Sequence, residues 1–146
     1  MRKQLVDKIN QYLSNLSVMY FKLHNLHWNV VGPQFMEVHK FLEEQYEEYS
    51  KKLDAVAESL KQNDEYPLGS INKYLSITTL TELEDKDYNV IKTIDILLSD
   101  TSHLKHLAQE IRYLALEEDI HLIVNMMEEH LTDYSKTMWF LFSTQK

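Results

Sequence analysis

The residue types best suited to metal chemistry occur as two pairs with the same spacing. His39 and Glu43 are four positions apart, and so are Asp54 and Glu58, so each pair occupies adjacent turns of one helix face. Glu43 and Asp54 are eleven positions apart, about three turns, which aligns both pairs on one stripe to within roughly 20°. Along the helix axis the pairs are about 16 Å apart, whereas metal ligands lie within about 2–2.6 Å of an ion. One ion therefore cannot contact both pairs of the same chain.

The spacing is symmetric about a point just before Tyr49, because residues 39 and 58, and residues 43 and 54, are equidistant from it. Two copies of the helix, antiparallel across a twofold axis at this point, bring His39 beside Glu58 of the partner subunit. Glu43 then lies beside Asp54 of the partner subunit, and the isologous contact creates two equivalent sites. A carboxylate-rich site with one or two imidazoles suits iron or another divalent first-row metal, with manganese and zinc as alternatives.

A fifth potential ligand is His27, which precedes a tight turn. Gly32 and Pro33 favour the end of one helix and the start of the next, so the two helices form an antiparallel hairpin. His27 lies five positions before Gly32 and His39 lies seven after it, at nearly the same height of the hairpin. His27, His39 and Glu43 are therefore expected to converge at one end.

Simpler interpretations stay open for each of these residues. The three carboxylates suit the solvated face of a helix in an acidic protein, and a lone histidine such as His27 suits a hydrogen-bonded core position. His24 is expected to pack or hydrogen-bond near His27, whereas His103, His106 and His130 are expected on the surface. A Glu-x-x-His motif occurs only at residues 118–121, at a helix start, so an intrachain di-iron centre is not expected.

Composition limits the class of protein. A chain of 146 residues with a formal net charge of −8 suits one domain, 1–146, that attracts cations rather than nucleic acid or anionic membranes. The absence of cysteine excludes disulfides and thiolate metal sites. Neither a membrane-spanning stretch nor a signal-peptide pattern is recognised, so we expect a soluble, cytoplasmic protein.

Apolar residues at three- and four-residue spacing predict an all-α protein of four long helices. These helices are expected near residues 3–31, 33–60, 81–114 and 117–141, with a short extra helix at 71–77. Thr81 and Glu84 match a capping box that would open the third long helix. The long join between the second and third helices predicts one crossover, which is the connectivity of a ferritin-like four-helix bundle.

Several of these segments together resemble the Dps miniferritins, the DNA-binding proteins from starved cells. The resemblance covers nearly the whole chain, and its ligand motif is highly specific. It is carried by His27-Trp28-Asn29-Val30-Val31-Gly32, by Phe35, His39, Phe41, Asp54, Ala57 and Glu58, by Pro67-Leu68-Gly69-Ser70, and by Trp139-Phe140.

The resemblance implies a homododecamer, a hollow shell with tetrahedral symmetry in which the short helix helps to form the twofold contact. It also implies a ferroxidase with a di-iron site shared between two subunits. Fe(II) would be oxidised there, preferably by hydrogen peroxide, and ferric mineral would be stored inside. The family's ligands correspond to His27, His39 and Glu43 of one chain with Asp54 and Glu58 of the partner subunit.

Two features depart from the family pattern. Aspartate is usual in the family at the position of Glu43, and glutamate keeps the charge but reaches one methylene further, so activity is still expected. The family often binds DNA through a lysine-rich tail, which the terminal residues here do not provide. We therefore expect no appreciable DNA binding at physiological salt.

Two alternative functions are a non-enzymatic shell with a zinc-occupied or silent site, and a helical module that binds a partner through its apolar faces.

Overall fold

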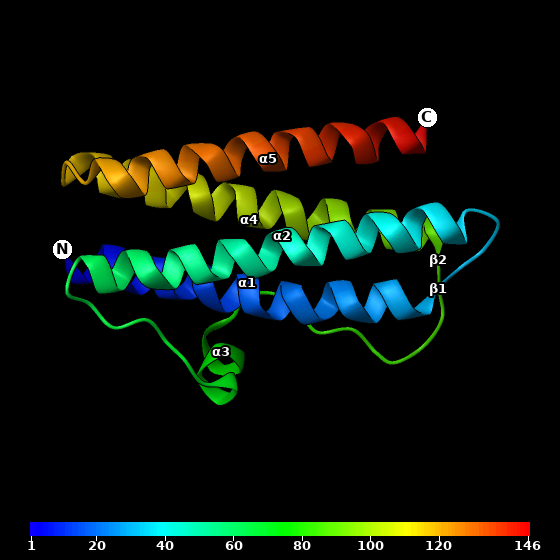
Figure 1. Ribbon diagram of the computed structural model, residues 1–146, viewed down its shortest axis with the longest axis horizontal. Coiled ribbons are helices and arrows are strands. Elements are labelled where there is room, and N and C mark those ends of the chain that lie inside the picture. Colours follow the sequence, from blue (N-terminus) through cyan, green and yellow to red (C-terminus); the bar gives the residue numbers. More distant parts are fainter.

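The computed structural model describes residues 1–146 as a bundle of four long helices with one short helix outside it (Figure 1). The long helices are α1 (Lys3–Asn29), α2 (Phe35–Gln62), α4 (Val90–Glu117) and α5 (His121–Gln145). Figure 1 shows that α1 and α2 form one antiparallel hairpin and that α4 and α5 form another. The predicted all-α, ferritin-like architecture is confirmed.

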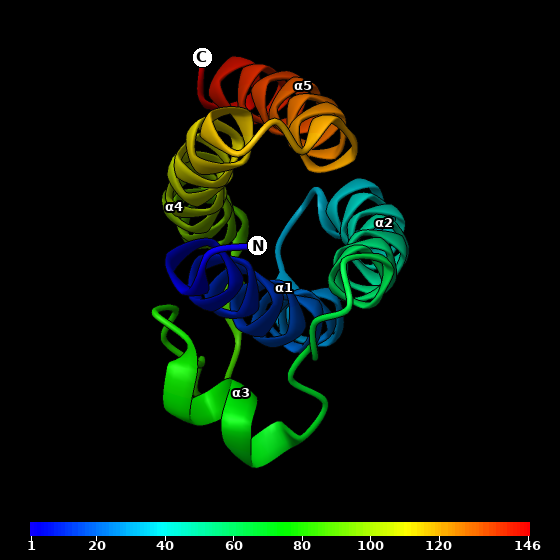
Figure 2. The same ribbon diagram turned by 90° about the vertical axis from the view of Figure 1, so that its left-hand side faces the viewer.

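The short helix α3 (Ile71–Ile77) has the bounds expected from the sequence. Figure 2 shows it on the outer side of α1, away from α5. It lies within the crossover that carries the chain from the end of α2 to the start of α4, at the opposite end of the bundle (Figure 1). The predicted single crossover is therefore also confirmed.

Two short strands hold the far end of this crossover against the connection between α1 and α2. Strand β1 (Val30–Val31) follows α1, and β2 (Tyr88–Asn89) precedes α4. The strands pair in parallel, with Val30 opposite Tyr88 and Val31 opposite Asn89. The pairing fixes the beginnings of α2 and α4 at the same end of the bundle. Because residues 30 and 31 are in β1, α1 ends at Asn29, slightly earlier than expected, and Gly32 takes a positive φ of 127° in the turn that follows.

The start of the third long helix was predicted wrongly. Residues 78–87 are not helical, and α4 begins at Val90 rather than near Thr81. Asn89 is the N-cap, and its side-chain oxygen accepts a hydrogen bond from the backbone N–H of Lys92 at 2.7 Å. The physical reason is the distance that this segment must span. An extended residue covers about 3.3 Å along the chain and a helical residue only about 1.5 Å, so an extended segment spans the bundle with fewer residues. The crossover must return along the bundle before α4 can start.

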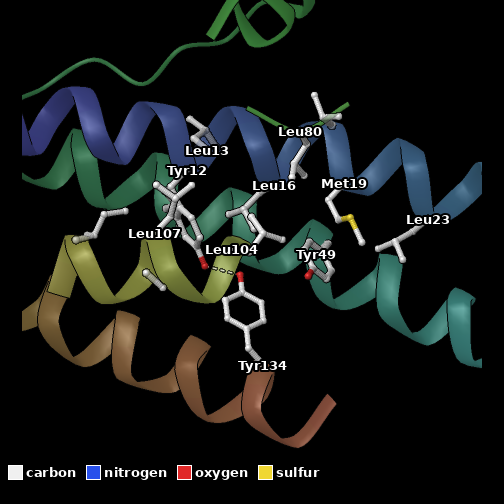
Figure 3. Packing of buried hydrophobic residues seen from close by; sticks show 14 of the residues in the cluster. Tyr12, Leu13, Leu16, Met19, Leu23, Tyr49, Leu80, Leu104, Leu107 and Tyr134 are labelled. Carbon is white, nitrogen blue, oxygen red and sulfur yellow. Dashed lines mark hydrogen bonds between the residues drawn. The ribbon is translucent and has the colours of Figure 1, made fainter. Parts of the chain in front are cut away.

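The core is formed by the apolar stripes of all four long helices. The three- and four-residue spacing places these side chains on the inward faces, where they are almost completely buried. Figure 3 shows this packing, with Leu13, Leu16 and Met19 of α1 close to Leu104 and Leu107 of α4. No helix is both long enough and apolar enough to span a bilayer.

Candidate metal centre

His27 and His39 form a reciprocal pair at one end of the α1–α2 hairpin. Nδ1 of His27 lies 2.7 Å from the carbonyl oxygen of His39, and Nδ1 of His39 lies 2.7 Å from the carbonyl oxygen of His27. The two rings are stacked, with centroids 3.7 Å apart and planes 13° from parallel. The predicted equal height of these two residues in the hairpin is therefore confirmed.

The hydrogen bonds select one arrangement of protons on each ring. A carbonyl oxygen can only accept, so each Nδ1 carries a hydrogen and donates it. In the neutral imidazole the remaining lone pair then lies on Nε2, which is the atom left available to a metal ion. A backbone carbonyl on the opposite nitrogen is the usual way in which a protein orients a ligating histidine. This pair has the proton arrangement that a metal site requires.

Tyr46 adjoins the histidine pair and was not identified as a site residue from the sequence. Its ring meets that of His27 edge-on with centroids 5.4 Å apart, and it stacks on the ring of His24 at 3.8 Å. Partial burial, with the nearby carboxylates of Glu43 and Glu47, raises the pKa of the Tyr46 phenol. Tyr46 lies one turn after Glu43 on α2. Because Glu43 is a predicted ligand, this spacing could have indicated from the sequence that Tyr46 lies near the site.

His24 is part of the packing around this pair, as expected. Its Nδ1 donates to the carbonyl oxygen of Tyr20 at 2.8 Å while its ring stacks on Tyr46. Trp28 is 67% exposed, and its ring lies 5.5 Å from that of His24. His24 and Trp28 thus pack near the histidine pair and are not part of its hydrogen bonds.

The carboxylates of α2 are exposed, and they are not gathered around one point. Glu43 lies one turn beyond His39, and Asp54 and Glu58 lie next to each other about three turns further along α2. A hydrogen bond from Glu58 to Asp54, repulsion between the two carboxylates and slight desolvation raise the pKa of Glu58. No cluster of three or more His, Asp and Glu side chains within the chain could hold a metal ion. Completion of the site by a second copy of the chain stays a prediction.

The Glu118–His121 motif does not point into the bundle. Oε1 of Glu118 accepts a hydrogen bond from the backbone nitrogen of Arg2 at 2.9 Å. Nε2 of His121 lies 2.9 Å from Asp119, and both side chains are exposed. The first contact ties the start of the chain to the end of α4, and the second lies within the turn between α4 and α5. The motif therefore has a structural role.

The expectation for His130 was wrong, because it is buried rather than on the surface. It is 5% exposed, and its Nδ1 lies 2.8 Å from the hydroxyl of Tyr12. Burial, assisted by the positive charge of Lys52 and opposed by Asp133, lowers the pKa of His130 to about 4. Met127, His130 and Tyr134 follow the three- and four-residue spacing of the buried face of α5, and this periodicity was the overlooked signal.

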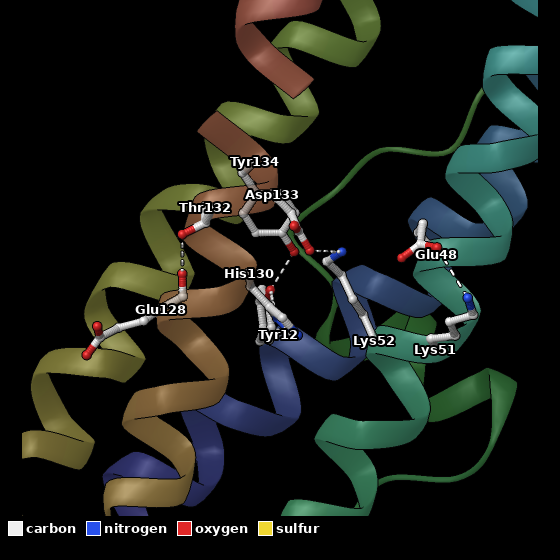
Figure 4. Close-up of polar contacts among 9 residues, drawn as sticks. All are labelled: Tyr12, Glu48, Lys51, Lys52, Glu128, His130, Thr132, Asp133 and Tyr134. Atoms are coloured by element: carbon white, nitrogen blue, oxygen red, sulfur yellow. Dashed lines mark hydrogen bonds and ion pairs between the residues drawn. The ribbon is translucent and has the colours of Figure 1, made fainter. Parts of the chain in front are cut away.

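Two ion pairs link helices, one of them inside the bundle and the other at its edge, where the Asp133 side chain is 56% exposed. Nζ of Lys22 in α1 lies 2.6 Å from Oδ2 of Asp100 in α4, and both side chains are nearly buried. Nζ of Lys52 in α2 lies 3.0 Å from Oδ2 of Asp133 in α5 (Figure 4). Desolvation raises the pKa of Asp100 although Lys22 opposes the shift. One pair of charges is therefore nearly buried between α1 and α4, and the other joins α2 to α5 at the surface of the bundle.

We compared the chain with known protein families, because its four-helix fold and paired histidines are features that a family would share. The family model described as a ferritin-like domain matches residues 6–145. A DNA protection during starvation protein of Helicobacter pylori is 30% identical over 124 residues, covering 85% of this chain and 86% of that protein.

Solved structures agree with this assignment. The crystal structure of antigen TpF1 from Treponema pallidum superposes with a TM-score of 0.96 at 27% identity, covering 98% of this chain and 92% of that one. The Dps protein of Vibrio cholerae O1, described as a member of a broad superfamily of ferritin-like diiron-carboxylate proteins, has a TM-score of 0.94 at 27% identity, covering 99% and 90%. The chain belongs to the ferritin-like family, among the Dps proteins.

Proposed function

We propose that this protein stores iron and detoxifies it by oxidising Fe(II) at a site shared between two subunits of a hollow dodecamer. The ligands are His27, His39 and Glu43 of one chain, with Asp54 and Glu58 of the partner subunit. The reciprocal His27–His39 pair is the observation that carries the proposal, because its geometry leaves both Nε2 atoms available to a metal. Membership of the Dps proteins supports iron as the substrate.

The surface around the midpoint of α2 favours a second copy of the chain as the missing half. An apolar groove between α1, α2 and α3 is lined in part by Phe21, Leu53 and Ile71. Phe21 and Ile71 are 64% and 68% exposed and line the same groove, and contiguous exposed apolar surface marks interaction sites. The groove also reaches Ser50, which adjoins the proposed twofold axis. Antiparallel packing at this axis would bring the two halves of the site together.

The charges of the site favour the oxidised product. Three carboxylates stabilise Fe(III) more strongly than Fe(II), since the attraction grows with the charge of the ion. A cation between Asp54 and Glu58 would also relieve the repulsion that raises the pKa of Glu58. Two Fe(II) ions give up two electrons, which with two protons reduce hydrogen peroxide to two water molecules. Pairing the electrons in this way avoids release of hydroxyl radical.

Subunit mixing tests whether the site is shared. The variants His39→Ala and Asp54→Ala should each be inactive, because each lacks one half of every site. In a heterodimer of the two, one site combines the intact His39 with the intact Asp54, so random reassembly should restore about a quarter of the wild-type sites. Restoration is measured by ferric absorbance after anaerobic Fe(II) addition and hydrogen peroxide.

The control is each variant dissociated and reassembled alone, which should stay inactive. Failure of the mixture to regain activity, when wild type survives the same treatment, would contradict the shared site. Wild type that binds zinc but oxidises Fe(II) no faster than buffer would instead support the non-enzymatic shell.

A further inference from the structure

A hydrogen-bonded cluster lies inside the bundle and takes no part in the proposed iron site. It consists of Tyr12 of α1 with His130 and Tyr134 of α5. The hydroxyl of Tyr12 lies 2.8 Å from Nδ1 of His130 and also contacts the hydroxyl of Tyr134 (Figures 3 and 4). Tyr12 is 0% exposed and Tyr134 is 2% exposed.

The protons in this cluster are ordered by the state of His130. Because burial lowers the pKa of His130 to about 4, its imidazole is neutral at pH 7 and its Nδ1 can accept a hydrogen bond. Tyr12 then donates its single O–H to Nδ1 of His130. The oxygen of Tyr12 is left to accept the O–H of Tyr134. Tyr12 is therefore the one phenol of the pair with a base in contact with its proton.

We propose that Tyr12 is a one-electron donor that traps oxidising equivalents escaping from the iron site. The source of the oxidant rests on the proposed function, in which Fe(II) meets hydrogen peroxide. Loss of an electron makes a phenol a strong acid, so a hydrogen-bonded base that takes the proton makes the oxidation easier. His130 is such a base, held in place by the same bundle.

The electrons and protons of this step balance. A hydroxyl radical gains one electron from Tyr12 and becomes hydroxide, which is protonated by solvent. The Tyr12 proton moves to Nδ1 of His130, leaving a neutral phenoxyl radical beside an imidazolium. Fe(II) that binds later returns one electron and becomes Fe(III), and the proton moves back to the Tyr12 oxygen. The positive charge of nearby Lys52 disfavours the imidazolium and promotes this return.

Aromatic rings connect the proposed iron site with the cluster. Tyr46 is 5.4 Å from His27 by ring centroids, and Tyr49 follows Tyr46 by one turn of α2, with Cβ atoms about 5–6 Å apart. The ring of Tyr49 lies 6.5 Å from that of Tyr134, whose hydroxyl contacts Tyr12. The first and last of these steps are contacts between rings, and one turn of α2 joins Tyr46 to Tyr49, so an electron can leave Tyr12 along this route without any oxidant entering the core.

The test is freeze-quench electron paramagnetic resonance of the assembled protein after Fe(II) and hydrogen peroxide. Ring-deuterated tyrosine identifies the signal as a tyrosyl radical. Tyr12→Phe should lose most of this signal while its rate of ferric formation stays at the wild-type value. Tyr113→Phe, at an exposed position on α4, is the matched control and should leave the signal unchanged. A tyrosyl signal of equal size in Tyr12→Phe would overturn the proposal while leaving the iron site intact.

Two further variants keep the test decisive if Tyr12→Phe fails to assemble. Tyr134→Phe should preserve the radical but shift its g-values, since the phenoxyl oxygen loses a hydrogen-bond donor. His130→Gln should lower the yield because the base is removed. A signal unaffected by either change would contradict the assignment.

A test without iron separates this proposal from the proposed function. Azide radical produced by pulse radiolysis oxidises aromatic side chains directly. It should generate a long-lived tyrosyl radical in wild type and much less of it in Tyr12→Phe. Equal yields in the two proteins would reject Tyr12 as the trap, whatever the outcome with Fe(II).

Discussion

His27 and His39 each donate an Nδ1 hydrogen to the other's backbone carbonyl oxygen, at 2.7 Å in both directions. The two residues come from opposite arms of the α1–α2 hairpin. Each ring therefore secures the turn and is itself oriented by it. The same pair of contacts links the stability of this end of the bundle to the position of both imidazoles.

The first prediction concerns this pair. His39→Phe removes a proposed ligand and leaves the His27 carbonyl oxygen without its donor. We expect Fe(II) oxidation to fall by at least about tenfold and the free energy of unfolding to fall by about 1–3 kcal/mol. Ferric absorbance and urea unfolding measure the two effects. His106→Phe on the exposed face of α4 serves as control, and equal losses in both variants would argue against a special role for His39.

The second prediction concerns the charge and length of Glu43. Glu43→Asp keeps the carboxylate, so Fe(II) oxidation should persist with a change of only a few-fold. Glu43→Gln keeps the length but removes the charge, and a loss of about 10–100-fold is expected, as for other disturbances of a metal site. Anaerobic Fe(II) titration by calorimetry, alongside initial rates, separates binding from oxidation. If Glu43→Asp did not oxidise Fe(II) and Glu43→Gln oxidised it at the wild-type rate, the assignment of Glu43 as a ligand would be contradicted.

The third prediction follows from the neutral state of His130. Its pKa is about 4 in the folded protein against an ordinary value of 6.5, so below pH 6.5 the unfolded chain binds a proton that the folded chain does not. His130 therefore leaves the free energy of unfolding unchanged above pH 6.5 and lowers it progressively as the pH falls from 6.5 toward 4. Between pH 7 and pH 5 the loss should be about 2 kcal/mol.

Urea unfolding of wild type and His130→Gln at both pH values measures this contribution. The glutamine variant should show a smaller decrease on acidification, whereas His106→Gln should behave like wild type. Parallel decreases in all three proteins would mean that His130 is protonated normally.

The fourth prediction concerns the buried pair Lys22–Asp100. Lys22→Met leaves a buried carboxylate without its partner and should cost about 3–5 kcal/mol of unfolding free energy. The double variant Lys22→Met/Asp100→Leu should recover much of this loss, because no charge is left buried. Lys3→Met breaks an exposed pair with Asp7 and should change stability by less than about 1 kcal/mol. An additive double variant would show that the two charges do not interact.

The fifth prediction concerns DNA. The formal net charge of −8 opposes association with a polyanion, so no retardation of plasmid mobility is expected at about 150 mM salt. An electrophoretic assay over a range of salt concentrations checks this. Retarded mobility at about 150 mM salt would show the expectation to be wrong.

The helices and half of the candidate site could be predicted from local spacing. Apolar periodicity gave the four long helices and the bounds of α3, because helical hydrogen bonds join residues only four positions apart. The tight turn at Gly32 was sufficient to place His27 beside His39. The pairing of these residues with Asp54 and Glu58 of a second chain stays a prediction.

What only the tertiary structure decided depends on contacts between distant residues. α4 begins at Val90 because Tyr88 and Asn89 pair with residues 30 and 31, a contact across 58 positions that no local capping pattern reveals. His130 is buried because Tyr12, 118 positions away, satisfies its ring nitrogen. The sequence determined that four long helices and one short helix form and which face of each long helix is apolar. The three-dimensional packing determined which polar groups find partners inside, because a buried polar group is retained only where a distant segment supplies its hydrogen bond.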